Sequence, residues 1–328
     1  MPSAPAIAPM LPHPDVEARA RVAMRSAGTL RPRDALWRLD ELAAWLAGWQ
    51  RTNRPGVSSP GVVVFAADHG VARRGVSAYP QSITAAMFRA LQEGAATAAV
   101  MARAVGAELR VVDVGVGDPT GDIAVEDAMS DERFAASFEA GRQEVRDLDC
   151  DLLAFGELGI GNTTAAAALA AALFGLEADR WVGRGTGIDD ASLARKIEIV
   201  KLARQRVIGD PPFEMLRRVG GAELAAIAGA TLEARLRSIP VVLDGFVATA
   251  AVATLEIAQE GALDHCVAGH CSAEPGHRLL LDRLHLDPLL QLDLRLGEAS
   301  GALAAIPLIR LACVCTTEVA TFSEWDRR

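Results

Sequence analysis

One ten-residue segment, FGELGIGNTT from Phe155 to Thr164, combines a carboxylate with a glycine-rich turn. Gly159 and Gly161 allow the backbone to approach a ligand closely, and residues 162–164 (Asn, Thr, Thr) favour the start of an Ala-rich helix. Free N–H groups at a helix start, together with the helix dipole, favour an anion such as a phosphate. Because that anion would repel Glu157, we expect this carboxylate to be catalytic or substrate-orienting; the alternative is a cap on a neighbouring N–H group.

A second glycine-rich loop, GRGTG, offers further backbone to an anion through Gly183 and Gly185. Lys196 follows in the next helical segment, where it either reaches a phosphate or remains a solvated surface lysine. The G-x-G-x-G spacing does not match the dinucleotide-binding motif, and the chain has no P-loop sequence. These segments therefore predict a phosphate site that belongs to neither of those two nucleotide-binding classes.

Polar residues also follow other apolar runs. Asp68 and His69 in ADHG suggest an acid–base pair, and Tyr79, the only tyrosine, suggests an aromatic surface on which a flat ring can stack. Asp244 stands in LDGF at the end of a further run. The segment AGHCSAEPGH contains four polar residues that could be imagined as a metal site: His270, Ser272, Glu274 and His277. Their spacing matches no established metal-binding motif, so we expect no metal.

These motifs are placed by short, fully apolar runs that alternate with helical stretches. Runs of this kind predict strands buried on both faces, and the alternation predicts an α/β fold with a doubly wound, mostly parallel sheet. Ligands bind outside the carboxyl ends of such strands, so the decorated strand ends predict one shared site. The expected strands are residues 62–66, 109–114, 152–156, 181–183, 239–243 and 265–269.

Composition limits the class of protein. The chain has 328 residues, 51% of them hydrophobic, and a formal net charge of −9, with no Lys/Arg run typical of nucleic-acid binders. Its most apolar run, residues 165–176, is shorter than the roughly 20 residues of a membrane span, and residues 1–14 form a Pro-rich, flexible lead unlike a signal peptide. Five cysteines without a Cys-x-x-Cys pair predict buried small residues. We expect a cytoplasmic protein without nucleic-acid or membrane partners.

The ordered motifs ADHGVARRGVSAYPQSIT, FGELGIGNTT, GRGTGIDD, VVLDGFVATAA, GHCSAEPGH and LRLGEASGALAAIPL resemble the nicotinate-nucleotide–dimethylbenzimidazole phosphoribosyltransferases. The resemblance covers about residues 62–322. It implies transfer of 5-phosphoribosyl from nicotinate mononucleotide to 5,6-dimethylbenzimidazole, by a homodimer that uses no cofactor. It also implies a Rossmann-like α/β domain, residues 56–310, and a small helical domain built from residues 1–55 and 311–328.

The resemblance further assigns roles to residues of this chain. Glu318, in TEVATF, matches the general base, and Glu157 matches a second active-site carboxylate. Two departures concern Ala86 and Met87, where a glutamine is common near the benzimidazole, and the short tail after Glu318. The expected substrate-binding residues are Asp68, Tyr79, Met87, Gly159, Gly161, Asn162, Thr163, Gly183, Gly185, Lys196, Asp244, Ser272, Glu274 and Gly297.

Two other functions remain open at the level of sequence. In a nucleotide N-glycosyl hydrolase, Glu157 would activate water instead of a benzimidazole. In a non-catalytic nucleotide- or benzimidazole-binding protein, the same residues would bind ligand without turnover.

Overall fold

The centre of the molecule is a five-stranded sheet in the order β2-β1-β3-β4-β5, in which every neighbouring pair is parallel. The structure is a computed structural model that describes residues 11–185 and 187–327. The doubly wound, mostly parallel sheet predicted from the sequence is confirmed. The strands are β1 (Pro60–Ala67), β2 (Glu108–Gly115), β3 (Leu152–Leu158), β4 (Val241–Leu243) and β5 (Cys266–Ala268).

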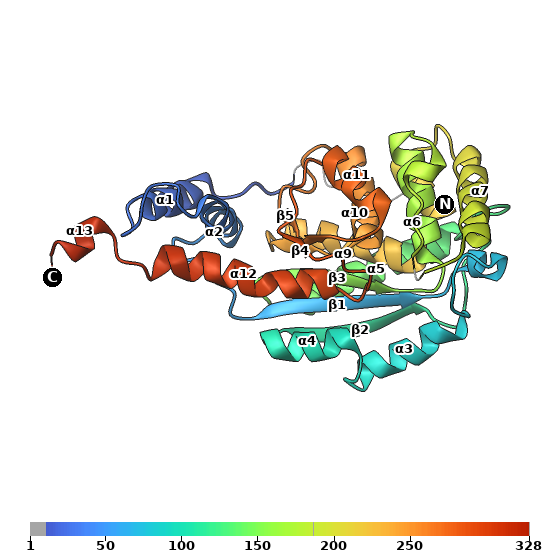
Figure 1. Ribbon diagram of the computed structural model, residues 1–328, viewed down its shortest axis with the longest axis horizontal. Coiled ribbons are helices and arrows are strands. Elements are labelled where there is room, and N and C mark those ends of the chain that lie inside the picture. Colours follow the sequence, from blue (N-terminus) through green and yellow to red (C-terminus); the bar gives the residue numbers. More distant parts are fainter. Residues whose placement is uncertain (1–10, 186, 328) are drawn as a thin grey trace.

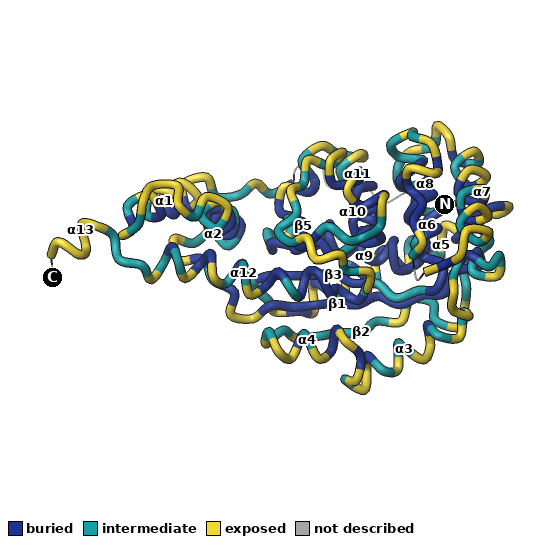
Figure 2. Tube along the Cα trace, in the orientation of Figure 1, coloured by how far each residue is buried: buried dark blue, intermediate teal, exposed yellow. Residues whose placement is uncertain are grey.

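The sheet is covered on both faces because its strands are apolar throughout. All eight residues of β1 are buried, and successive side chains point to opposite faces. Val63 and Phe65 join one hydrophobic cluster, whereas Val62 and Val64 join another. Figure 2 shows β1 as a buried strand, and the two clusters lie on its opposite faces.

Helices form the two layers, as Figure 1 shows. The larger layer consists of α5 (Asp131–Arg146), α6 (Asn162–Phe174), α7 (Asp190–Arg206), α8 (Pro212–Val219), α9 (Ala222–Leu236), α10 (Phe246–Ala258) and α11 (Pro275–Arg283). The opposite face carries α3 (Ser82–Gln92), α4 (Thr97–Val105) and α12 (Ser300–Thr317). Two short 3-10 helices are η1 (Gly70–Arg74) and η2 (Ala178–Arg180).

One predicted strand is wrong. Residues 181–183 pair with no strand, and Trp181 instead ends the η2 turn, buried and stacked on Phe174 with ring centroids 5.9 Å apart. A three-residue apolar run does not distinguish a strand from a buried turn. Downstream of β5, a separate two-stranded parallel sheet joins β6 (His270–Cys271) to β7 (Leu290–Gln291).

A small group of helices lies at one end of the molecule (Figure 1). It contains α1 (Val16–Ala27), α2 (Trp37–Gln50), the end of α12 and α13 (Phe322–Trp325). The end of α1 meets the segment after α12 there: Thr29 forms an antiparallel bridge with Thr321, and Arg25 Nε donates to the Thr316 carbonyl at 2.9 Å. Residue 310, the predicted domain boundary, therefore falls inside α12.

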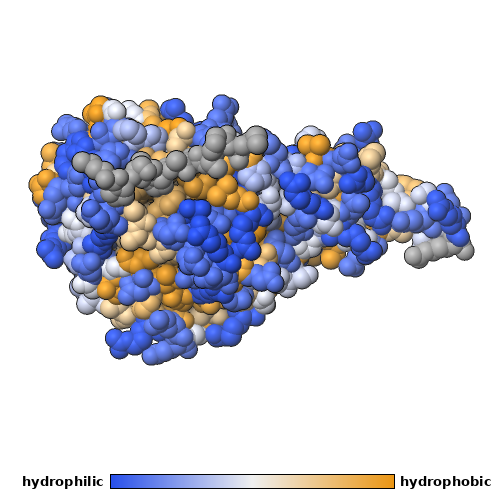
Figure 3. Space-filling view, turned by 180° about the vertical axis from the view of Figure 1, so that it is seen from behind, coloured by the Kyte–Doolittle hydropathy of each residue, from blue (hydrophilic) through white to orange (hydrophobic). Residues whose placement is uncertain are grey.

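The predicted flexible lead lies only partly within the described residues. Residues 1–10 are outside them, whereas Leu11 is buried in the larger hydrophobic cluster. The end of the lead is thus packed, which differs from the expectation. On the face opposite that of Figure 1, apolar side chains are interspersed with hydrophilic ones (Figure 3).

Helix α12 has the length and hydropathy of a membrane-spanning helix, a feature that the sequence survey of apolar runs did not detect. More than half of it, 56%, is buried inside the protein. A core helix in contact with both the sheet and α2 satisfies the same test of length and composition, so the feature is weak evidence for a membrane span.

Candidate active site

A cavity of about 170 Å³ opens at the carboxyl ends of β3 and β4, the edge of the sheet where the sequence predicted a shared site. Eight of the expected site residues line it: Glu157, Gly159, Asn162, Thr163, Gly185, Ser272, Glu274 and Gly297. Its wall also contains residues that the sequence analysis did not select: Leu158, Ile160, Gly245, Phe246, Val247, Arg295, Leu296 and Glu298.

The turn between β3 and α6 has the geometry of an anion site. Gly161 is the N-cap of α6 with φ of +99°, a conformation that strongly favours glycine. Ile160 N–H donates to Thr84 Oγ1 at 3.2 Å, which fixes the turn against α3. The N–H groups of Asn162 and Thr164 donate to the Gly159 and Gly161 carbonyls at 3.2 and 3.0 Å, so the start of α6 offers the cavity chiefly the positive end of its helix dipole.

Glu157 lies at the end of β3 as a half-buried residue that lines the cavity. Burial raises its pKa to about 8, and the nearby charges of Asp244 and Glu223 add to this effect. Asn162 Nδ2 donates to Glu157 Oε2 in a short contact that opposes the shift. The side chain therefore exists largely in the protonated form at neutral pH, ready to donate a hydrogen bond or to ionise when a positive charge enters the cavity.

Glu298 is the second acid of the cavity, and it was missed by the sequence analysis. It is almost fully buried, and burial raises the pKa of its carboxyl group. The backbone holds it beside Glu157, because Glu298 N–H donates to the Glu157 carbonyl at 3.1 Å. Only the adjacent Gly297, in the LRLGEASG motif, was selected from sequence.

The backbone at Glu298 is strained. Glu298 and Ala299 both have positive φ, +62° and +64°, in a region that residues other than glycine rarely adopt. Gly156 of β3 makes this arrangement possible, because a Cβ there would lie 2.3 Å from the Ala299 nitrogen. Such strain concentrates at functional sites, which supports a role for the side chain it orients.

Lys196 lies beneath the opposite end of the cavity. Its Nζ donates to Thr163 Oγ1 at 2.8 Å and to the Gly183 carbonyl at 3.1 Å. Burial lowers its pKa to about 8, although nearby Glu274 favours the charged form. Glu274 in turn accepts from Gly185 N–H at 2.9 Å, so the GRGTG loop and the start of α6 meet around one amine.

Asp244 lies behind the cavity wall and anchors α12. Its Oδ1 accepts from the N–H groups of Gly301 and Ala302 at 2.8 and 3.0 Å. Burial raises the pKa of Asp244 to about 6 and lowers that of His270 to about 4. At neutral pH the carboxylate is therefore ionised and His270, 3.6 Å away, is neutral.

The expected residues of the first loop lie away from the cavity wall. His69 pairs with Glu223, Nε2 to Oε1 at 2.6 Å, and not with Asp68, so the predicted acid–base pair is wrong. Asp68 is buried and accepts from Gly117 N–H at 2.8 Å. Tyr79 is 53% exposed. Met87 shares the α3 face of Thr84, one turn along, and packs partly buried against the second hydrophobic cluster.

Glu318 does not reach the cavity within one chain. Helix α12 begins at Ser300, beside the Glu157–Glu298 contact, and Glu318 follows its last residue. Eighteen residues at a rise of about 1.5 Å place Glu318 about 27 Å away, exposed among the small group of helices. The structure thus puts Glu298, not Glu318, beside the second carboxyl group.

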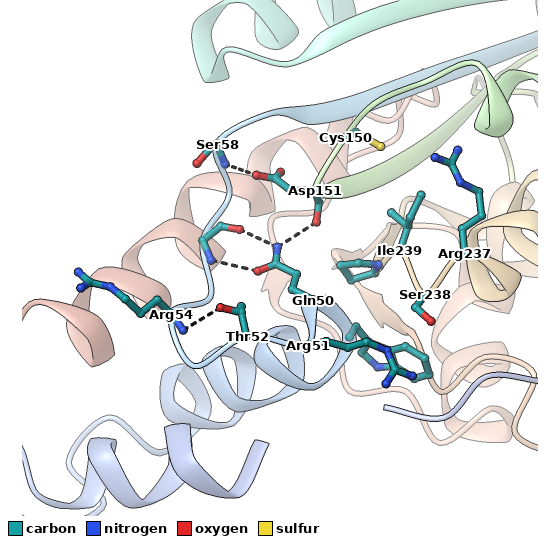
Figure 4. A pocket seen from close by; sticks show the side chains of 13 residues that line it. Gln50, Arg51, Thr52, Arg54, Ser58, Cys150, Asp151, Arg237, Ser238 and Ile239 are labelled. Carbon is teal, nitrogen blue, oxygen red and sulfur yellow. Dashed lines mark hydrogen bonds between the residues drawn. The ribbon is translucent and has the colours of Figure 1, made fainter. Parts of the chain in front are cut away.

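A second cavity, of about 590 Å³, lies at the amino ends of β1, β3 and β4, the opposite edge of the sheet. Figure 4 shows that polar side chains of this cavity form hydrogen bonds with neighbouring backbone groups. Gln50 Nε2 donates to the Gly56 and Asp151 carbonyls at 2.7 and 3.0 Å, and Asp151 accepts from Ser58 and Ser59 N–H groups. Asp151 is the one carboxyl group among the described residues that line this cavity, whereas Glu157, Glu274 and Glu298 line the first one.

Within residues 11–185 and 187–327, no group of three or more His, Cys, Asp and Glu side chains is arranged to hold a metal ion. His270 and His277 instead face each other edge to face, with centroids 5.9 Å apart.

Known proteins match this chain in both sequence and fold. A family model described as phosphoribosyltransferase matches residues 11–325. The chain belongs to this family. A nicotinate-nucleotide–dimethylbenzimidazole phosphoribosyltransferase of Methylorubrum extorquens is 47% identical over 95% of this chain and 92% of the relative. One of Cereibacter sphaeroides is 45% identical over 96% and 93%, respectively.

Solved structures of this phosphoribosyltransferase family share the fold. The crystal structure of CobT from Thermus thermophilus has a TM-score of 0.91 and 42% identity, covering 94% of this chain and 98% of that one. The family model, which spans residues 11–325, covers both the sheet domain and the small group of helices.

Proposed function

We propose that this chain transfers 5-phosphoribosyl from nicotinate mononucleotide to 5,6-dimethylbenzimidazole or a related base, giving α-ribazole 5′-phosphate and nicotinate. The observation that carries the proposal is that one cavity combines two acids, the half-buried Glu157 and the buried Glu298, with the glycine turn above Lys196. Relatives 45–47% identical over nearly their whole length are named for this reaction.

The donor phosphate fits the end of the cavity formed by α6 and the GRGTG loop. The positive end of the α6 dipole and the Lys196 ammonium supply positive charge there. The pKa of Lys196, near 8, leaves most of the side chain protonated at neutral pH, and a bound phosphate favours this form further. This end therefore anchors the donor while its C1′ faces the acids.

The acceptor ring fits the apolar wall next to those acids. Leu158, Ile160 and Leu296 provide a surface for a flat aromatic ring, and Glu298 lies beside it. As one ring nitrogen attacks C1′, the bond from C1′ to nicotinate breaks, and the proton on the other ring nitrogen passes to Glu298. A positioned base of this kind contributes typically about 10² to 10⁴ in rate.

Glu157 acts on the other side of the exchange. The pyridinium ring of the donor carries a positive charge, which favours ionisation of a carboxyl group whose pKa is about 8. The carboxylate then stabilises the positive charge that develops on the ribose as nicotinate departs. Attack opposite the leaving ring inverts C1′ and gives the α-linkage.

A single assay separates transfer from hydrolysis. Purified protein is incubated with nicotinate mononucleotide, with and without dimethylbenzimidazole, and nicotinate release is followed by chromatography. We expect release only when the base is present, together with one α-ribazole 5′-phosphate per nicotinate. Release at the same rate without the base would identify a nucleotide N-glycosyl hydrolase.

We also propose that the protein works as a homodimer. The small group of helices exposes Val16, Met24 and Trp37, and a cavity of about 500 Å³ lies between α1 and α2. Burying such side chains against a second copy would remove apolar surface from water. Light scattering should give twice the mass of one chain, and Trp37→Arg should lower it.

A further inference from the structure

His277 is a buried histidine that does not line the cavity but contacts a residue that does. It lies in α11, fully buried between α10 and the loop after β6. Its Nδ1 is 2.9 Å from both the backbone nitrogen and the Oγ of Ser272, and its Nε2 is 3.1 Å from Thr249 Oγ1. Ser272 itself is half-buried and lines the cavity.

The contacts determine the tautomer of the ring. A backbone N–H can only donate, so Nδ1, which receives the N–H of Ser272, carries no proton. Burial lowers the pKa of His277 to about 3, so the ring is neutral at physiological pH. The single ring proton is therefore on Nε2, from which it is donated to Thr249 Oγ1.

The same contacts leave one hydrogen-bond donor available to a ligand. Nδ1 has one lone pair, for which the N–H and the hydroxyl group of Ser272 compete. An acceptor in the cavity can take the hydroxyl proton without leaving Nδ1 unpaired, because the backbone N–H still occupies it. His277 thus holds the Ser272 backbone against α11 and leaves the serine hydroxyl, on a residue that lines the cavity, free to turn to a ligand.

We propose that His277 is a positioning residue for the nucleotide donor, which it serves by orienting Ser272 so that the serine hydroxyl donates to an oxygen of the ribose phosphate. This inference rests on the proposed function. Gly185 and Thr163, on the phosphate side of the same cavity, line it together with Ser272. The residue that contacts the donor is Ser272, and His277 acts through it.

The test is a double-mutant cycle in which the Michaelis constant (KM) is measured for each of the two substrates. We expect His277→Ala and Ser272→Ala each to raise the KM for nicotinate mononucleotide about tenfold, the loss of one hydrogen bond to a charged group. The KM for dimethylbenzimidazole should stay within about twofold of its original value. The double variant should be no worse than either single variant, because both remove the same interaction.

Two further variants separate positioning from general packing. His277→Asn, whose amide oxygen can accept from Ser272 N–H, should restore most of the donor affinity. His265→Asn is the matched control, since His265 is equally buried but precedes β5 at the opposite edge of the sheet. We expect this control to lower the melting temperature without changing the KM for the donor.

Several results would overturn the proposal: additive effects of His277→Ala and Ser272→Ala, equal increases in both KM values, or no rescue by asparagine. If the variants fail to fold, ¹⁵N spectra of histidine-labelled wild-type protein decide instead, and a proton on Nδ1 of His277 would refute it. Calorimetric binding of nicotinate mononucleotide gives the same cycle without turnover. Absence of turnover in the wild type would therefore reject the proposed function and leave the role of His277 measurable.

Discussion

The strongest prediction concerns which glutamate accepts the proton. Replacing Glu298 with glutamine removes the acid–base group but keeps the size of the side chain and the oxygen that accepts from Ala98 N–H at 3.4 Å. The φ of +62° disfavours glutamine about as much as glutamate, so the strained backbone should change little. The substitution therefore isolates proton transfer from folding.

The expected loss follows from the position of Glu298 beside the apolar wall. General-base catalysis by a positioned group contributes about 10² to 10⁴, so kcat should fall by that factor, equivalent to about 2.7–5.5 kcal/mol in the barrier. Because burial raises the pKa of Glu298 and the base must be ionised, wild-type kcat/KM should rise with pH through a midpoint above 4.5. This acidic limb should disappear in Glu298→Gln.

The assay is α-ribazole 5′-phosphate formation from saturating substrates between pH 5 and 9, with Glu318→Gln as the matched control. The control should keep wild-type kcat, because Glu318 lies about 27 Å along α12 from the cavity. Loss of activity in Glu318→Gln, with Glu298→Gln nearly unaffected, would refute the reasoning. It would instead mean that a partner chain supplies the base.

Three other perturbations test the remaining parts of the site. The pKa of Glu157 is raised from 4.5 to about 8 in the folded state, so the folded protein binds more protons than the unfolded chain between these two pH values. The free energy of unfolding should therefore fall as pH rises from 4.5 to 8, by at most about 1.4 kcal/mol per pH unit. Urea titrations of Glu157→Gln should show a smaller change of unfolding free energy with pH. Lys196→Met should weaken calorimetric binding of nicotinate mononucleotide about 10- to 100-fold, and wild-type binding should weaken as pH rises through about 8, where the amine loses its proton; unchanged binding would place the phosphate elsewhere. Gly156→Ala should lower both activity and melting temperature, since its Cβ would lie 2.3 Å from the Ala299 nitrogen, whereas a fully active variant would show that the Glu298 backbone needs no such contact.

The parts of the site that follow regular elements could be predicted from the sequence. Glu157 and Gly161 lie at a strand-to-helix junction, where an apolar run, a glycine and helix-capping residues occur in order. Such signals are local, because strand burial and helix starts depend on neighbouring residues. The location of the cavity followed from the parallel order of the strands.

Glu298 could not be found in the same way, because it reaches the cavity through an irregular segment between β7 and α12. Its left-handed backbone depends on a distant partner, Gly156, and on the contact with the Glu157 carbonyl. Neither contact leaves a periodic pattern in the sequence. Resemblance pointed to Glu318, another glutamate further along the chain, which the fold places at the far end of the same helix.

The His69–Glu223 pair shows a second limit. Adjacent Asp68 and His69 suggested an acid–base pair, but consecutive residues after a strand point in different directions. His69 instead pairs with Glu223, and Asp68 accepts from Gly117 N–H. The pairing depends on α9 crossing the sheet, and sequence spacing does not report that crossing.

The course of α12 has a consequence for how this protein can be recombined. Its first residues are fixed by Asp244 beside the cavity, and its last turn packs with α1 and α2 in the small group of helices. A chimera of two relatives joined within this helix would combine one parent's anchor with the other parent's packing surface. Functional crossovers should therefore fall in the connector before β1 or ahead of Ser300, and residues 300–328 should be inherited together with the N-terminal helices as one unit.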